Sequence, residues 1–171
     1  MSEDTRAAIR GMLAAHNTVS LATSEQGQPW VATVFYASDA ELNLYFVSDS
    51  RTRHGRHMQA NARVAGAINP DCGTWDEVKG LQLEGRVEVL SGGPRLKGLG
   101  YYLAKFHDVK ALFEQPRDRN EETIAKRLQA ANLYCLRPDR IRLIDNSRWF
   151  GFKEELELAA PDPVADPQPR G

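Results

Sequence analysis

The sequence has few cysteines, no long apolar run and no signal-peptide pattern. Its two thiols, Cys72 and Cys135, lie far apart in the chain, which suits a reducing compartment better than a fold held by disulfides. No apolar run approaches the about 20 residues that a membrane-spanning helix requires. The first residues, Met1-Ser2-Glu3-Asp4, are acidic and polar, unlike the start of a signal peptide. We therefore expect a cytoplasmic protein with no membrane partner.

The chain also has almost no net charge, since its formal net charge is -1 at pH 7. A chain so close to neutrality is no polycation that would seek nucleic acid, so any bound anion must be met by a local cluster of cations. Its 171 residues suit one domain that buries a core without disulfides. We expect this domain over 1–158. The stretch 159–171 holds four of the nine prolines and is expected to be a disordered tail.

Motifs of common nucleotide-binding and hydrolase folds are missing, because neither G-x-G-x-x-G nor G-x-S-x-G occurs. The segment 80–87 has the glycine spacing of a P-loop, but Arg86-Val87 replaces the required Lys-Ser/Thr. His54, His57 and Cys72 offer metal-ligand chemistry. The arginines beside both histidines would repel a cation, so we expect no metal site.

Hydrophobic periodicity predicts a mainly β chain with peripheral helices, which favours a closed or partly closed antiparallel barrel. The expected helices cover 3–15, 52–60, about 94–106 and 118–131. The expected strands cover 18–23, 29–37, 41–48, 63–69, 81–90, 132–145 and 147–158.

Two of these strands carry additional information. The strand 29–37 is apolar on both parities, which fits a barrel wall with a helix or a second subunit packed outside it. The strand 81–90 alternates cleanly, and Gly85 takes a place on its apolar side. A glycine there predicts a bulge or a close backbone approach.

The segment LYFVSDSRTRHGRH, residues 44–57, gathers three arginines and two histidines directly after a strand. If Thr52 or Ser50 caps the following helix, Arg51, Arg53 and His54 lie at its N-terminus, where cations are unfavourable. A bound phosphate would explain them, because helix N-termini and guanidinium groups both suit that anion. A solvated basic helix end with nothing bound explains the composition equally well.

Five segments follow one another along the chain, namely LAT, PWVATVFYA, LYFVSDSRTRH, ANARVAGAIN and GLQLEGRVEVL. Their order resembles the pyridoxamine 5'-phosphate oxidase-like split β-barrels over residues 5 to about 157. The ending RIRLIDNSRWFGFKEEL, at 140–156, is more similar to the uncharacterised YhbP-like subgroup.

This resemblance implies a six-stranded antiparallel split β-barrel that forms a homodimer, with flavin mononucleotide (FMN) in a groove between the subunits. In that arrangement Thr52, Arg53 and His54 match the phosphate-binding triplet, while Asn146 and Trp149 cover the flavin from the partner subunit. The full set of cofactor-binding positions is Ala32, Thr33, Val34, Val47, Ser48, Thr52, Arg53, His54, Gln82, Asn146 and Trp149. Two features depart from the oxidase pattern, which has an arginine on the strand matching 31–36 and a lysine in place of His54.

With FMN bound, the cofactor would supply the redox chemistry. The first hypothesis is an FMN-dependent oxidoreductase that acts on a small organic substrate, with no catalytic side chain identified. The second is a non-catalytic flavin- or haem-binding protein, and the third is a structural dimer that has lost its ligand. Four histidines are possible axial ligands of a haem, namely His16, His54, His57 and His107.

Overall fold

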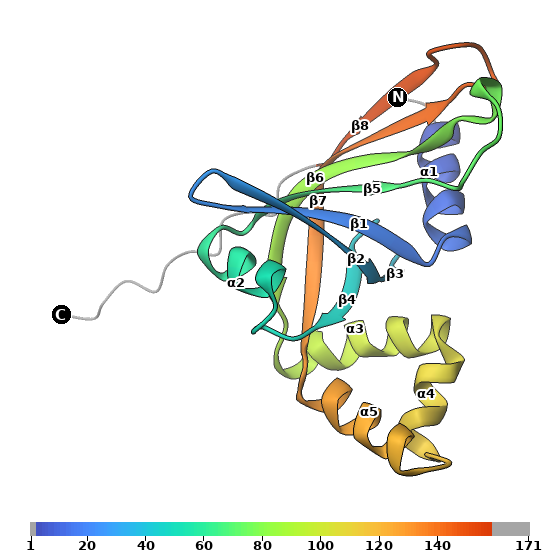
Figure 1. Cartoon of the computed structure of the whole chain (residues 1–171). Coiled ribbons are helices and arrows are strands. Elements are labelled where there is room, and N and C mark those ends of the chain that lie inside the picture. The colour runs from blue at the N-terminus through green and yellow to red at the C-terminus, as the bar shows by residue number, and fades with distance from the viewer. Residues whose placement is uncertain (1–2, 159–171) are drawn as a thin grey trace.

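One curled antiparallel sheet organises residues 3–158, which are the residues that the computed structural model describes (Figure 1). Hydrogen bonding places the strands in the order β2-β1-β5-β6-β7-β4-β3, and β8 pairs with β7. The strands are β1 (Thr18–Glu25), β2 (Gln28–Phe35), β3 (Ala37–Ser38), β4 (Leu44–Ser48), β5 (Arg63–Ile68), β6 (Lys79–Val89), β7 (Asn132–Asp145) and β8 (Lys153–Glu157).

Five α-helices and one 3-10 turn accompany the sheet within the described part of the chain. Helices α3, α4 and α5 form one excursion between β6 and β7 and project below the sheet in Figure 1. The helices are α1 (Glu3–Ala15), α2 (Arg53–Ala60), η1 (Trp75–Glu77), α3 (Gly92–Lys105), α4 (His107–Glu114) and α5 (Arg119–Ala130). None of those described is long and apolar enough to cross a membrane.

The predicted fold class is confirmed, with a different number of strands. Residues 3–158 form eight strands rather than the six that the resemblance implies or the seven that the periodicity predicts, because the stretch expected as one strand over 29–37 forms two, β2 and β3. The strand expected from residue 41 starts at Leu44, since Leu42 has a positive φ of 72° in the preceding turn. The strand expected from residue 147 starts at Lys153, after a turn. Helix α4 was not predicted, and the expected tail 159–171 lies outside the described residues.

The barrel is split between β2 and β4. These strands lie close together, yet within residues 3–158 no backbone ladder joins them, so β2 is one edge of the sheet. Inside the curl, the apolar core includes Leu21, Phe46 and Leu81, which are at most 1% exposed. Burial of such side chains is worth about 1.5–3 kcal/mol each.

The predicted irregularity at Gly85 is present. The register between β6 and β7 shifts between Glu84 and Gly85. A Cβ atom on Gly85 would lie 2.1 Å from the carbonyl oxygen of Arg137, closer than any van der Waals contact allows. The missing side chain therefore lets the two strands of this bulge approach each other.

Lys105, at the end of α3, ties this helix to the C-terminus of α1. Its Nζ donates hydrogen bonds to the carbonyl oxygens of Leu13 (3.2 Å) and His16 (2.5 Å). The same ammonium lies 4.3 Å from the ring centroid of Tyr36. Burial without a carboxylate partner lowers the pKa of Lys105 to about 8.

This lowered pKa predicts a pH dependence of stability. Between about pH 8 and its ordinary value of 10.5, the unfolded chain holds the Lys105 proton more tightly than the folded chain does. The free energy of unfolding should therefore rise with pH across this window, and Lys105→Met should remove that rise. Burial of Cys135 raises its thiol pKa to about 11 and acts in the opposite direction. The measurement is thus the difference between wild type and Lys105→Met in urea unfolding, and a pH-independent difference would contradict the prediction.

Candidate functional site

Helix α2 begins shortly after β4, and its N-cap is Thr52. Of the two predicted caps, Thr52 and Ser50, the structure therefore selects Thr52. The Thr52 hydroxyl accepts a hydrogen bond from the Gly55 amide at 3.1 Å and donates one to the Asp49 carbonyl at 2.7 Å. A Cβ atom on Gly55 would lie 2.7 Å from the carbonyl oxygens of Asp49 and Ser50. The helix therefore packs tightly on the loop before it, and the Thr52 side chain fixes the helix start.

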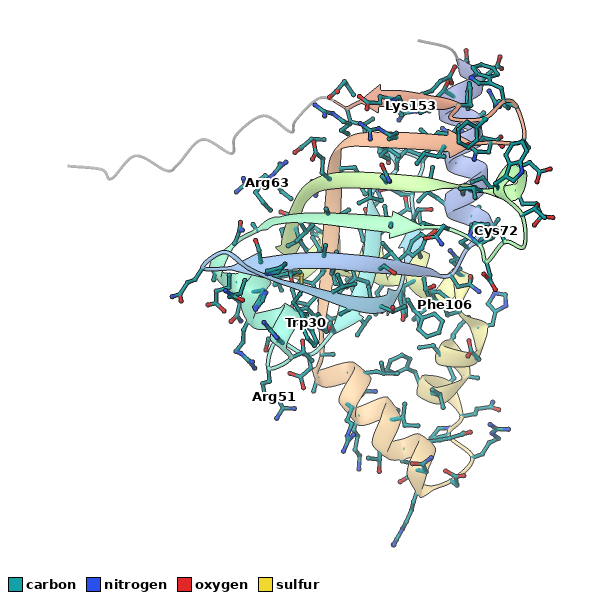
Figure 2. All side chains as sticks on the ribbon, turned by 45° about the horizontal axis from the view of Figure 1, so that its top comes forward. Trp30, Arg51, Arg63, Cys72, Phe106 and Lys153 are labelled. Carbon is teal, nitrogen blue, oxygen red and sulfur yellow. The ribbon has the colours of Figure 1, made fainter. Side chains whose placement is uncertain are left out.

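Arg51 is neutralised by a carboxylate of its own loop. Its Nε lies 3.1 Å from both oxygens of Asp49, and its Nη2 lies 2.6 Å from Oδ2. These hydrogen bonds lower the pKa of Asp49 to about 2. The sequence grouped Arg51 with Arg53 and His54 as cations that a bound phosphate would explain, whereas in the structure Asp49 of the same loop already pairs with Arg51. Figure 2 shows the Arg51 side chain pointing away from the sheet.

Arg53 is held differently, by an aromatic ring and a histidine. Its Cζ lies 4.5 Å from the ring centroid of Trp30 on β2, and its Nε donates to Nε2 of His57 at 3.4 Å. Nε is the one guanidinium nitrogen of Arg53 that donates a hydrogen bond to a described residue. Four of the five N–H donors of the guanidinium group, two on each terminal nitrogen, therefore have no hydrogen-bond partner among the described residues.

Two histidines surround the start of α2 with different roles. His54 Nε2 lies 2.6 Å from the Ser48 hydroxyl, and burial, followed by the charge of His57, lowers the pKa of His54. His54 therefore offers an N–H donor at neutral pH rather than a full charge. His57 is 4% exposed, and its Nδ1 lies 3.3 Å from the Thr23 hydroxyl.

Sequence reasoning missed the contribution of His57 and Trp30 to placing Arg53. The i, i+4 spacing of Arg53 and His57 was a usable signal, because such residues lie on one helix face. The contact with Trp30 had no local signal, since it joins elements that are distant in sequence. Among residues 3–158, no group of three or more His, Cys, Asp or Glu side chains is arranged to hold a metal ion.

The predicted strand residues flank the split. Ala32, Thr33 and Val34 lie on β2, where Val34 is buried and Thr33 faces outward. Val47 and Ser48 lie at the half-buried end of β4, directly before α2. Because β2 lies close to both β4 and α2, these five residues and the Arg53 region form one neighbourhood.

Gln82, Asn146 and Trp149 lie elsewhere in the chain. Gln82 on β6 and Thr33 on β2 lie opposite each other in register across the sheet, with β1 and β5 between them. Three strand spacings separate the two residues, which is roughly 14 Å. Asn146 shapes the β7–β8 turn by donating to the Trp75 carbonyl at 2.8 Å. Trp149 in the same turn is 62% exposed. One chain therefore does not bring these three residues to Arg53.

The outer face of the sheet around β2 has no cover within residues 3–158. Val31 and Phe35 are 58% and 56% exposed, so the helix or subunit expected outside this strand is not supplied by the described chain, apart from an edge contact of Phe35 with Phe106 at 5.4 Å. The neighbouring outward positions carry small side chains, namely Ser20, Ala22, Ala65 and Ala67. Figure 2 shows these strands running side by side as a broad surface.

Comparisons of sequence show which proteins are similar. The profile described as pyridoxamine 5'-phosphate oxidase matches residues 5–144. The UPF0306 protein YhbP of Salmonella paratyphi A is 30% identical over 151 residues, which cover 88% of this chain and 91% of the relative.

Solved structures share the fold at lower identity. A haem-binding protein from Mycobacterium smegmatis has a TM-score of 0.69 and 18% identity, over 92% of this chain and 59% of that one. An FAD-binding protein from Mesorhizobium loti has a TM-score of 0.57 and 23% identity, over 82% of this chain and 92% of that one. At these identities the likeness shows the split-barrel fold alone.

Proposed function

Because the chain belongs to the pyridoxamine 5'-phosphate oxidase family and to its YhbP-like subgroup, we propose that it binds FMN at the split of the barrel. The flavin phosphate is held at the start of α2 by Arg53, His54 and the capped backbone. The ring lies along Ala32, Thr33 and Val34 on β2 and along Val47 and Ser48 at the end of β4.

The observation that carries this proposal is that the Arg53 side chain is held in place while most of its N–H donors have no partner among residues 3–158. Trp30 and His57 orient the guanidinium, while its terminal nitrogens stay uncommitted within the described residues. Amide groups at the start of α2 and the helix dipole favour an anion at the same place. Arg51 is already paired with Asp49 and His54 has a lowered pKa. Arg53 is thus the principal full positive charge offered to the phosphate.

A homodimer completes the proposed site. The exposed Val31 and Phe35 would be covered by the same face of a second subunit in a two-fold arrangement. Gln82 lies on that outer face as well, and Asn146 and Trp149 lie in an exposed turn. These three residues would reach the flavin of the partner subunit, since their own chain keeps Gln82 at a distance from the β2 edge.

The proposed activity is oxidation or reduction of a small organic substrate. FMN, when bound, supplies hydride transfer, and the chain's own residues bind and orient it and exclude water from its ring. A non-catalytic flavin- or haem-binding protein is the second proposal, supported by the fold shared with the haem-binding protein of Mycobacterium smegmatis. Of the four possible axial ligands, the two beside the proposed phosphate site are engaged within the chain, because His57 is buried and His54 is bonded to Ser48. At this place, flavin is therefore favoured over haem.

Visible spectroscopy tests this proposal. We expect the protein to be purified yellow, with flavin absorbance at about 450 nm, or to quench FMN fluorescence on titration with a Kd of about 1 μM or lower. Bleaching by NADPH or NADH would support the oxidoreductase, whereas a bound flavin that no donor reduces would support the carrier. A Soret band with no flavin signal would replace FMN by haem. Absence of both signals, even with excess FMN, would refute ligand binding at the split.

A further inference from the structure

A second recess adjoins the proposed phosphate site on the side of α5. It is a cleft of about 990 Å³ between the segment Val47–Arg51 and the C-terminal half of α5. Small-molecule sites in proteins commonly occupy about 300–1,000 Å³, so the cleft has the size of a ligand site. From α5 it is lined by Thr123, Ile124, Lys126, Arg127 and Leu128.

The charges that line this cleft are unbalanced. Lys126 and Arg127 form no ion pair with any of the described residues, whereas Asp49, the carboxylate in the lining, is already bound by Arg51. Two exposed cations therefore face a segment that also offers the Ser48 and Ser50 hydroxyl groups. Such a concentration of one sign of charge in a recess attracts an anion.

The two cations are not needed to hold α5 in place. Ala125 is the buried residue of this helix, and Arg95 ties its end by donating to the Ala131 carbonyl at 3.3 Å. Asp118 caps its start by accepting from the Glu121 amide at 2.8 Å. Lys126 and Arg127 are thus free to act on a ligand, and their replacement should leave the helix folded.

We propose that this cleft is an anion subsite, in which Lys126 and Arg127 bind a phosphate or carboxylate group while Ile124 and Leu128 offer apolar surface to the attached molecule. The identity of the neighbouring ligand rests on the proposed FMN site. The anion has two possible sources, which share this chemistry. It is either the diphosphate extension of FAD, continuing from the flavin phosphate, or the acidic group of a substrate that binds beside FMN.

The test uses Lys126→Gln/Arg127→Gln in the full chain. Its matched control is Lys97→Gln/Arg119→Gln, which removes the same charge from surfaces outside the cleft. The first arm compares the Kd of FAD with that of FMN by fluorescence quenching. If the subsite holds the FAD extension, wild type and control bind FAD at least about 10-fold tighter than FMN. The cleft variant should then lose this advantage and keep its FMN affinity.

The second arm titrates inorganic pyrophosphate into FMN-loaded protein by calorimetry. If the anion belongs to a separate substrate, FAD and FMN bind equally, and pyrophosphate binds wild type and control at least about 10-fold tighter than the cleft variant. The subsite is overturned if FAD and pyrophosphate each bind the cleft variant as they bind wild type. Protein that takes up no flavin is tested with pyrophosphate alone. Binding that depends on Lys126 and Arg127, but not on Arg53, would keep the subsite while the FMN proposal fails.

Discussion

Arg53→Ala is expected to weaken FMN binding by about 10- to 100-fold, which corresponds to ~1.5–3 kcal/mol for a charge-assisted hydrogen bond. The reason is that the other positive groups near the start of α2 have other partners or a reduced charge. Arg51 is bound to Asp49, and His54 has a lowered pKa and a hydrogen bond to Ser48. Arg56 donates to the Arg51 carbonyl oxygen. Residues 31–36, on β2 and the residue after it, contain no cation where the oxidase pattern has an arginine, so Arg53 carries most of the attraction. Fluorescence titration with FMN gives the affinity.

Two further variants make this result specific. Arg51→Ala removes an equal charge from the same loop, and we expect at most about a 3-fold change, because an exposed pair of this kind contributes little. Arg53→Lys keeps the charge but loses the fork and should fall between wild type and Arg53→Ala. If Arg51→Ala and Arg53→Ala weakened FMN binding equally, the phosphate would be attracted by general charge and the assignment to Arg53 would be wrong. Equal thermal unfolding midpoints confirm that each variant is folded.

Val31→Asp/Phe35→Asp is expected to convert the proposed dimer to a monomer and to weaken FMN binding by at least about 100-fold. In a two-fold interface each carboxylate occurs twice, and burying an unpaired charge costs several kcal/mol. The flavin should be lost with the proposed interface, because Gln82, Asn146 and Trp149 would then no longer reach the Arg53 region of a partner subunit. Light scattering coupled to size-exclusion chromatography measures the mass, and FMN titration measures the affinity.

The control for this variant is Leu96→Asp on α3, which is 72% exposed and lies away from the β2 face. It should remain dimeric and bind FMN as wild type does. Val31→Asp alone guards against a folding defect, since Phe35 also contacts Phe106 whereas Val31 has no aromatic contact of this kind. A double variant that stays dimeric would show that the β2 face is not the interface. A monomer with unchanged FMN affinity would show that the site is complete within one chain.

The backbone of this fold was largely predictable from local patterns. Alternation identified β6, and the glycine on its apolar side gave the bulge, because both signals depend only on which face a residue takes. The cap at Thr52 followed from a hydroxyl residue directly before a helix. Helix α4 was missed because its eight residues carry no capping side chain and contribute no buried residue.

The site was less predictable, because its contacts join distant parts of the chain. Composition alone gave Arg51 and Arg53 the same weight. The structure separates them, since Asp49 neutralises one and Trp30, 23 positions earlier in the sequence, orients the other. The cations of α5 had no motif at all. They become relevant only when the chain returns α5 to the end of β4.

The path of the chain between β6 and β7 has a consequence for how this protein family can vary. Val89 pairs with Tyr134, and the Leu90 amide donates to the Leu133 carbonyl at 2.9 Å, so the helical excursion leaves and rejoins the sheet at adjacent points. A tight hairpin could replace it without shifting any strand register. If the cleft on α5 binds an anion as proposed, exchange of this helical excursion would change the ligand preference and leave the strands of the proposed flavin site unchanged.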